Sequence, residues 1–488
     1  MRKATIAALA VVLIIAGALG AYAFLSLGPT TTGTSSCPSN YEGNAPIRTT
    51  LNYSTTGHIT VYNLPKSSRA PNAITVAPDG SVWFGEESLP ALAHLYANGT
   101  LLEYVWPGPY PPPGSLDYSC RYRTQIWGVA LWNGTVWATD SSGDQLVNLN
   151  PVTGDFHFYT LAANAFPDYM VAGLDGRLWF TELYVPAIVS LDENGTAHTY
   201  TLPTGFQGTP TQIYFVNSTY ALYDDAGQAG VNNGGVYAFN PSQPVFTRLG
   251  GPRNLTGLTG LATASGGIWI SEHGPPFINF YNYSSAGWTD FPTSTVPYVS
   301  TTLPYFILSD GTNVWFNEHY GDRIAEIVPS AHSMVEYAVS NPPVENLSSI
   351  TGSLTIARAG ERIWFTEFGG NRVGFADFSA PPPFSLQPLT SHSVTVKPGG
   401  SVTLSFDLVG NSTSPVRLKF SDSEETSAVP AKLNATSSSY QFAYLANSTL
   451  FTLTLSAAPG LSPGIYTFDV AATNGSVTCT AFLRVTVP

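Results

Sequence analysis

Residues 363–372 read IWFTEFGGNR, and close variants of this phrase recur along the chain. An apolar residue precedes a Trp, and an acidic residue follows that Trp by three positions. Seven copies align, although the fourth, YALYD, lacks the Trp, and their acidic residues are Glu86, Asp140, Glu182, Asp224, Glu272, Glu318 and Glu367. Successive acids lie 42 to 54 residues apart. A period of about 40–50 residues built from short strands is typical of a β-propeller, in which each blade is a four-stranded sheet.

The third copy shows the internal pattern of one repeat most clearly. Two turns that contain Gly, Leu174-Asp175-Gly176 and Glu193-Asn194-Gly195, separate short runs of apolar and aromatic residues. Tight turns favour Gly because its backbone accepts a positive φ. We therefore predict four strands, at residues 169–172, 177–181, 187–191 and 196–202. We expect the Trp and Phe of each phrase to fill the space between neighbouring sheets with apolar area.

The seventh copy ends before a fourth strand is complete. After Val373-Gly374-Phe375 the chain soon reaches Pro381-Pro382-Pro383. Residues 58–65, HITVYNLP, have the pattern of a fourth strand but precede the first copy. An N-terminal strand that completes the last blade would close the ring and leave no unpaired edge there. The sequence therefore predicts a seven-bladed propeller at residues 58–380.

Residues 384–488 follow a different pattern, without the Trp phrase. Stretches such as SVTVKPGGSVTLSFDLVG alternate apolar and polar residues and contain Pro-Gly turns. About 100 residues of this kind indicate a small β-sandwich of the immunoglobulin-like type. The predicted fold class is therefore all-β. We expect the sandwich to act as a spacer, an adhesion module or a packing partner of the propeller.

The N-terminus reads as a membrane anchor or a signal peptide. Arg2 and Lys3 precede an apolar run that extends to about residue 27, long enough to span a bilayer. An Ala-x-Ala pattern at residues 21–23 keeps cleavage open as an alternative. We expect residues 1–28 to be this segment and residues 29–57 to form a Ser/Thr-rich stalk. The rest of the chain would then lie on the extracellular face of the membrane, or be secreted after cleavage.

Glycosylation acceptors and cysteines agree with an extracellular location. Twelve Asn-x-Ser/Thr sequences occur, and the candidate acceptors include Asn98, Asn133, Asn194, Asn217, Asn254, Asn346, Asn434 and Asn474. The three cysteines allow three pairings, and we predict the Cys37–Cys120 bridge, which leaves Cys479 as a buried strand cysteine. Zinc is disfavoured because the sequence has no CxxC motif or Cys/His cluster.

The charge of the chain argues against nucleic acid as a partner. The formal net charge is −13, and Lys and Arg together number only 19. Binding to a phosphate backbone requires clustered cations, which this sequence lacks.

The seven acids are predicted to lie on one face of the propeller. Each acid closes the second strand of its blade, so all seven share a face with the linkers between blades. Carboxylates held close together repel one another. Either a bound divalent cation such as Mg²⁺ or Ca²⁺ relieves this repulsion, or each carboxylate bonds to donors of its own loop.

The last three copies combine His with acid. The phrases SEHGPP, NEHYGDR and TEFGGNR place His273 beside Glu272 and His319 beside Glu318, with Glu367 in the third. Imidazole next to carboxylate is suited to general acid–base catalysis or to binding a divalent metal. Two exposed loop histidines are the alternative reading.

The repeat resembles that of a known family. The phrases ITVAPDGSVWFGE, GLDGRLWFTE and WFTEFGGNRVG are similar to the blade repeat of the virginiamycin B lyase family. The resemblance implies a seven-bladed propeller whose enzymes open a cyclic depsipeptide antibiotic by elimination. It also implies a histidine from a Pro-His-Gly-Ile phrase at the start of a blade, and magnesium held by glutamates. The glutamates correspond to Glu318 and Glu367 with Glu272. The starts of the blades carry Asn72, Gln125, Asp168, Gln212 and Tyr305 and no histidine.

These observations lead to competing functional predictions. The first is a surface-tethered recognition or scaffold protein whose propeller face binds a glycan, a peptide or a cell-envelope protein. The second is a divalent-metal-dependent lyase or hydrolase outside the cell, with His273 or His319 as the base and Glu272, Glu318 and Glu367 as metal ligands. The third is a purely structural component of a glycosylated envelope.

Overall fold

The computed structural model describes residues 45–65, 69–107, 124–202, 208–227, 234–249, 255, 257–273, 277–294, 302–339, 352–422 and 433–488. The predicted anchor or signal at 1–28, Cys37, Cys120, Asn254 and Asn346 lie outside these ranges. The described chain is all-β, and its single helix there is the 3₁₀ turn η1 (Pro329–Ala331). In these ranges no helix has both the length and the apolar character needed to cross a membrane.

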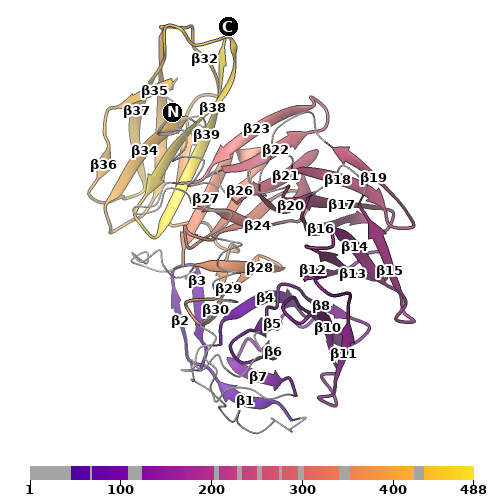
Figure 1. Ribbon diagram of the computed structural model, residues 1–488. Helices are drawn as coiled ribbons and strands as arrows, with labels where there is room; N and C mark the ends of the chain where they lie inside the picture. Colours follow the sequence, from indigo (N-terminus) through magenta and orange to yellow (C-terminus); the bar gives the residue numbers. More distant parts are fainter. Residues whose placement is uncertain are drawn as a thin grey trace, which may run out of the picture.

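Seven sheets follow one another along the first two-thirds of the described chain (Figure 1). We number them by their order in the sequence. The first four sheets consist of β4 (Pro71–Val76), β5 (Val82–Glu86), β6 (Ala91–Leu95) and β7 (Thr100–Val105); β8 (Val129–Trp132), β9 (Thr135–Asp140), β10 (Gln145–Leu149) and β11 (Phe156–Thr160); β12 (Pro167–Ala172), β13 (Leu178–Glu182), β14 (Ala187–Leu191) and β15 (Ala197–Thr201); and β16 (Pro210–Asn217), β17 (Tyr220–Asp225), β18 (Gly235–Asn240) and β19 (Gln243–Leu249).

The remaining three sheets repeat this order. They consist of β20 (Leu258–Ala264), β21 (Gly267–Glu272), β22 (Phe277–Asn282) and β23 (Gly287–Pro292); β24 (Pro304–Ser309), β25 (Val314–Glu318), β26 (Arg323–Val328) and β27 (Ser333–Ala338); and β28 (Ser353–Ala359), β29 (Arg362–Glu367) and β30 (Arg372–Asp377) with β3 (Ile59–Asn63). The first strand of each sheet contacts the first strand of the next, and β28 contacts β4. The seven first strands therefore form a closed ring around an axis (Figure 1).

An N-terminal strand completes the seventh sheet, as the sequence predicted. β3 pairs antiparallel with β30, from Ile59 opposite Ala376 to Asn63 opposite Arg372. The predicted stalk at 29–57 is wrong for its last part, because β1 (Ile47–Thr50) pairs with β7 and β2 (Tyr53–Thr56) pairs with β3. These outer strands hydrogen-bond to edges that the sheets would otherwise leave unpaired.

The side chains of the repeated Trp phrase lie between neighbouring sheets. The Trp residues of six copies are buried, namely Trp83, Trp137, Trp179, Trp269, Trp315 and Trp364. β3 contributes to two of the cores between sheets, because alternate residues of a strand point to opposite faces. Ile59 and Val61 pack in the core that contains Trp315, whereas Tyr62 packs in the core that contains Trp364. The predicted structural role of the aromatic residues is confirmed.

The C-terminal residues form one further sheet and extend the sixth sheet, and these two layers share one core. Their strands are β31 (Phe384–Pro388), β32 (Ser393–Thr395), β33 (Ser401–Gly410), β34 (Val416–Asp422), β35 (Leu433–Ser437), β36 (Gln441–Phe442), β37 (Ser448–Ala457), β38 (Gly464–Thr473) and β39 (Val477–Val487). β39 pairs antiparallel with β27, so one C-terminal sheet continues the sixth sheet edge to edge. Cys479 is buried in β39, as predicted. Backbone hydrogen bonds thus join this part of the chain directly to the ring.

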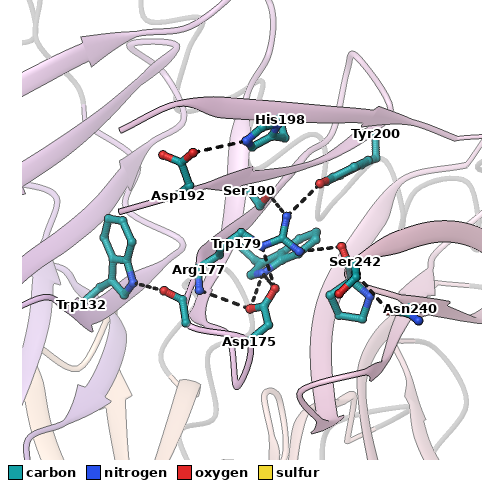
Figure 2. A network of polar contacts seen from close by, with 12 residues as sticks. Trp132, Asp175, Arg177, Trp179, Ser190, Asp192, His198, Tyr200, Asn240 and Ser242 are labelled. Atoms are coloured by element: carbon teal, nitrogen blue, oxygen red, sulfur yellow. Dashed lines mark hydrogen bonds and ion pairs between the residues drawn. The ribbon is translucent and has the colours of Figure 1, made fainter. Parts of the chain in front are cut away.

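A polar network joins the second, third and fourth sheets at the turn between β12 and β13 (Figure 2). Arg177 is central: its guanidinium donates to Asp175, Ser190, Tyr200 and the carbonyl of Pro241, at 2.5–3.2 Å. The same group lies 4.7 Å from the centre of the Trp179 ring. Trp132 of the second sheet donates to the carbonyl of Gly176 at 2.9 Å. One cation therefore satisfies acceptors from two sheets.

We expect Arg177→Ala to lower the free energy of unfolding by about 2 kcal/mol, because it removes several charge-assisted hydrogen bonds and a cation–π contact. Arg177→Lys should recover less than half of this loss, since an ammonium cannot reproduce the planar fork. Urea denaturation measures both values. Arg48→Ala, on the exposed side of β1, is the control and should have no measurable effect. Equal stability of Arg177→Ala and the wild type would contradict the assigned role.

Candidate functional site

The acids of the repeated phrase, apart from Asp224, close the second strands, and they lie on one face of the ring. In six sheets the acid or the residue in its place pairs with the first residue of the first strand, as in Pro71–Glu86, Pro304–Glu318 and Ser353–Glu367. Their exposed fractions are 6 % or less, so they are buried rather than displayed at loop tips.

Each of several carboxylates has its own partner within its own sheet. Asn279 donates to Glu272 at 2.8 Å, Gln145 donates to Asp140 at 2.8 Å, and both Nε and Nη2 of Arg372 lie 2.5 Å from the carboxylate of Glu367. Burial raises the pKa of Glu182 to about 6, and the negative charge of Asp144 acts in the same direction.

In the first and sixth sheets the acid lies beside a second buried Glu and an Arg. Arg69 pairs with Glu103 at 2.5 Å and lies 3.7 Å from Glu86. Correspondingly, burial and the neighbouring Glu336 raise the pKa of Glu318 well above its usual value, and Arg323 opposes this shift. A buried pair of carboxyls with one Arg is electrically neutral when one carboxyl is protonated, and burial favours this neutral state.

The predicted metal ligands Glu272, Glu318 and Glu367 do not form one site. Glu272 and Glu367 bond to partners in their own sheets, and Glu318 faces Glu336 across the sixth sheet. Within the described ranges, no group of three or more His, Cys, Asp or Glu residues is arranged to hold a metal ion. The residues present therefore do not fit the magnesium site that the family resemblance implied.

The register of the fourth sheet corrects one predicted residue. The position that Glu182 and Glu318 occupy in their sheets belongs to Asp225, which pairs with Pro210 on one side and Gly235 on the other. Asp224, which the sequence alignment assigned to the ring, precedes it by one residue. A shift of one residue turns a strand side chain to the opposite face. Asp224 thus takes the place that Thr181 holds in the third sheet and Asn317 holds in the sixth.

The position that Thr181, Asp224 and Asn317 share is important because its side chain supports a β-bulge at the start of the first strand. The register of the first strand shifts at that point in six of the seven sheets. The freed N–H of Tyr169 donates to Thr181 at 3.2 Å, and that of Phe306 donates to Asn317 at 2.9 Å. The N–H of Gln212 donates to Asp224 at 2.6 Å. Bulges of this kind redirect side chains and are frequent next to active sites.

Residues from the third to sixth sheets meet around the start of β24, and we call them the axial cluster: Asp168, Tyr169, Gln212, Asp224, His273, Tyr305, Phe306 and His319. Nε2 of His273 lies 3.4 Å from Nδ1 of His319. The ring of Tyr305 lies edge-on to both imidazoles, with centroids 5.1 and 5.7 Å away. The predicted pair of histidines is therefore brought together, with His319 buried and His273 half-buried rather than exposed.

The two histidines are neutral at ordinary pH. Burial lowers the pKa of His273 to about 4, and burial together with the neighbouring His273 lowers the pKa of His319 to about 3. His319 is 6 % exposed, and its buried Nε2 has no hydrogen-bond partner. A neutral pair joined by one hydrogen bond leaves a donor or an acceptor available, depending on the tautomer.

Two aspartates, Asp168 and Asp224, act on Tyr305 through their charges. Burial raises the pKa of Asp168 and of Asp224 to about 7, and the charge of Asp224 contributes to the shift at Asp168. Oδ1 of Asp168 and Oδ2 of Asp224 are buried without a hydrogen-bond partner. Both aspartates also raise the pKa of Tyr305, after burial, which is the larger cause. The axial cluster therefore contains buried polar atoms that nothing in the described chain satisfies.

The axial cluster lies at one end of a cavity between the first strands. The cavity has a volume of about 350 Å³, and Tyr169, Gln212 and Phe306 contribute to its lining. Residues farther along the first strands, among them Ala172 and Arg358, line the rest. A cavity lined by aromatic and aliphatic groups with a few convergent polar atoms is the usual setting of a ligand site.

Sequence reasoning identified only part of this site. His273 and His319 were predicted, whereas Asp168, Gln212 and Tyr305 were noted only as starts of blades that lack a histidine. All three residues follow a Pro at the start of a blade. Asp168 and Tyr305 come directly after it, in FPDYM and LPYFI, and Gln212 comes two residues after it, in TPTQI. That position begins the first strand, which lines the axis.

Comparisons with known proteins agree with this architecture. No protein-family model matches the sequence, and no curated protein matches it either. Among solved structures, a catalytically inactive histidine-to-alanine variant of virginiamycin B lyase from Staphylococcus aureus with quinupristin is similar, at 20 % identity and a TM-score of 0.52, over 65 % of this chain and 98 % of that one. Selenomethionine-substituted virginiamycin B lyase from the same organism matches at 21 % identity and a TM-score of 0.51, over 65 % of this chain and 98 % of that one.

A streptogramin B lyase structure is similar to the same extent. Its identity is 19 % and its TM-score 0.51, over 65 % of this chain and 96 % of that one. Identities this low establish the fold and leave the activity open. The ring of sheets in this chain is therefore a β-propeller with the fold of the virginiamycin B and streptogramin B lyases.

Proposed function

We propose that this protein is an extracellular recognition protein whose propeller binds its ligand at the axial cluster. The observation that carries the proposal is a set of buried, unpartnered polar atoms in the axial cluster, three other residues of which line the axial cavity. Leaving such atoms unsatisfied costs about 1–3 kcal/mol each, so a ligand that hydrogen-bonds to them recovers that free energy. A glycan or a peptide of a cell-envelope partner can supply such groups.

We further infer a seven-bladed propeller that is closed by β3, followed by an immunoglobulin-like sandwich. The pairing of β39 with β27 supports a spacer that holds the propeller in a fixed orientation. An N-terminal segment would tether the protein to the membrane, as the sequence predicts. The candidate glycosylation acceptors Asn98, Asn133, Asn194, Asn217 and Asn434 are exposed and Asn474 is half-buried, which suits a glycoprotein.

We do not propose the alternative of a metal-dependent lyase. Glu272 and Glu367 bond to partners in their own sheets, and in the part of the chain that the structure describes no three His, Cys, Asp or Glu residues are grouped to hold a metal ion. The neutral pair His273 and His319 remains available to bind a ligand through hydrogen bonds.

Binding of the full-length protein to arrays of glycans and of envelope-derived peptides tests the proposal. We expect specific binding that falls at least about tenfold in His319→Gln and in Tyr305→Phe, which each remove one polar contact of the site. His198→Gln is the matched control, because this histidine lies on the exposed β15. Binding that is unchanged in both site variants, or absent from every array, would refute the proposal.

A further inference from the structure

The pair Asp168 and Asp224 has no cationic partner among the described residues. In the part of the chain that the structure describes, no Lys, Arg or His forms an ion pair with either residue. This differs from the first, sixth and seventh sheets, where Arg69, Arg323 and Arg372 accompany the buried acids. Asp224 is 0 % exposed, and one oxygen of each aspartate is buried without a partner.

The charges of these carboxylates act on aromatic residues that pack against one another. Tyr169 follows Asp168 directly, and its ring centroid lies 6.2 Å from that of Phe306. Phe306 and Tyr305 are edge to face at 4.9 Å, and the charges of both aspartates act on Tyr305. The faces of aromatic rings attract cations, most strongly where water is excluded. Tyr169 and Phe306 line the cavity, and Asp168 and Tyr305 directly precede them in the chain. Together with Asp224, these groups offer complementary contacts to one positive group.

Resting on the proposed function, we propose that the axial cluster recognises a protonated primary amine, whose N–H groups donate to Asp168 and Asp224 while its first methylene groups lie against Tyr169, Tyr305 and Phe306. An ammonium carries three donors, enough for the two free carboxylate oxygens and one further acceptor. It would replace the arginine that accompanies buried acids elsewhere in the ring. The amine would belong to an amino sugar or to a peptide, either at a lysine side chain or at the N-terminus.

Proton linkage gives this proposal a second readout. Because both aspartates have raised pKa values of about 7, part of the population is protonated near neutral pH. A bound cation favours the ionised forms and therefore displaces protons. The affinity should accordingly rise between pH 5.5 and pH 8. The titratable groups that face the pair are Asp225 on β17, Tyr169 on β12, Tyr184 after β13 and Tyr305 on β24.

Isothermal titration calorimetry of the full-length protein with n-butylammonium chloride tests the proposal, with n-butanol as the neutral isostere. We expect binding of butylammonium only, with proton release seen as different heats in two buffers of unlike ionisation enthalpy. Asp168→Asn and Asp224→Asn should each weaken it about tenfold or more, since each removes a charged acceptor. Asp140→Asn, a buried acid of the same face that bonds to Gln145, should leave the affinity unchanged.

The possible outcomes separate the amine from the broader recognition function. Suppose that array binding depends on His319 and Tyr305 but that butylammonium and butanol give equal responses or none. This result overturns the amine proposal and leaves the recognition function standing. Binding of Mg²⁺ but not of butylammonium also overturns the amine proposal. If the Asn variants fail to fold, Phe306→Leu decides, because it removes an aromatic contact of the proposed amine and leaves both carboxylates in place: an unchanged affinity for butylammonium in this variant overturns the proposal. Glucosamine oligomers and lysine peptides, each compared with its N-acetylated form, then distinguish the two sources.

Discussion

We expect deletion of residues 58–65 to abolish the cooperative thermal unfolding of the propeller. The deletion removes β3, which pairs with β30 along five residues and with β2 on its other side. It also removes Ile59, Val61, Tyr62 and Leu64, all buried, from two cores between sheets. Burial of each such side chain contributes about 1.5–3 kcal/mol, so the sum is comparable to a total stability of about 5–15 kcal/mol.

Point variants in the same strand test closure without shortening the chain. Val61→Asp places an unpaired charge in a core and should lower the melting temperature by about 10 °C. Ser54→Asp is the matched control: it lies directly opposite Val61 in β2 but is exposed, so the melting temperature should hardly change. Circular dichroism during heating measures both. An unchanged melting temperature of the deletion variant would show that closure by β3 does not stabilise the ring.

The second large effect is on pH dependence: we expect the protein to become more stable as the pH falls from 8 to about 5. Burial raises the pKa of many carboxyls. The values reach about 8 for Glu87 and Glu367 and about 7 for Asp168, Asp224 and Glu326, and lie well above the usual range for Glu86 and Glu318. In the folded state these groups are protonated at pH values at which the unfolded chain has ionised them.

The direction follows from the linkage between proton binding and folding. Between about pH 5 and pH 7 the folded state binds more protons than the unfolded state, so the free energy of unfolding decreases as the pH rises. This stabilisation is fully present below the unfolded pKa of about 4 and is lost as the pH passes the folded values near 7 and 8.

The buried histidines oppose this trend at the acid end. The pKa values of His94 and His273 fall to about 4 and that of His319 to about 3, all mainly through burial. Their contribution is lost below pH 6.5, where the unfolded histidines become protonated. Because the shifted carboxyls outnumber the shifted histidines among the described residues, we expect the greatest stability at about pH 5.

Thermal melts at constant ionic strength between pH 4 and pH 9 measure this dependence. We expect the melting temperature at pH 5 to exceed that at pH 8 by about 5 °C or more. Glu318→Gln should flatten part of the slope, since the amide cannot ionise, whereas Asp192→Asn at an exposed turn should not. Greater stability at pH 8 than at pH 5 would contradict the assigned protonation states.

Local pattern alone predicted much of this fold. The spacing of the Trp phrase, the Gly turns and the unpaired HITVYNLP strand led to the order of the sheets and to the pairing of β3 with β30, because strand periodicity and turn chemistry are encoded over a few residues. The prediction of a stalk was wrong at residues 47–56. Pairing of these residues with the edge strands β7 and β3 outweighs their Ser/Thr-rich composition. The alignment of Asp224 was also wrong, because without the Trp nothing in YALYD distinguishes two registers that differ by one residue.

The sequence by itself therefore determined an all-β chain of repeated sheets and named the two histidines. Only the tertiary structure decided that the ring acids are buried beside partners of their own sheets, whereas Asp168, Asp224, Tyr305 and the histidines meet at the axis. These residues come from sheets that are separated by dozens of positions in the chain, and their contact depends on bulges and on ring closure. Closure is a property of all seven sheets together, so no single stretch of sequence contains it.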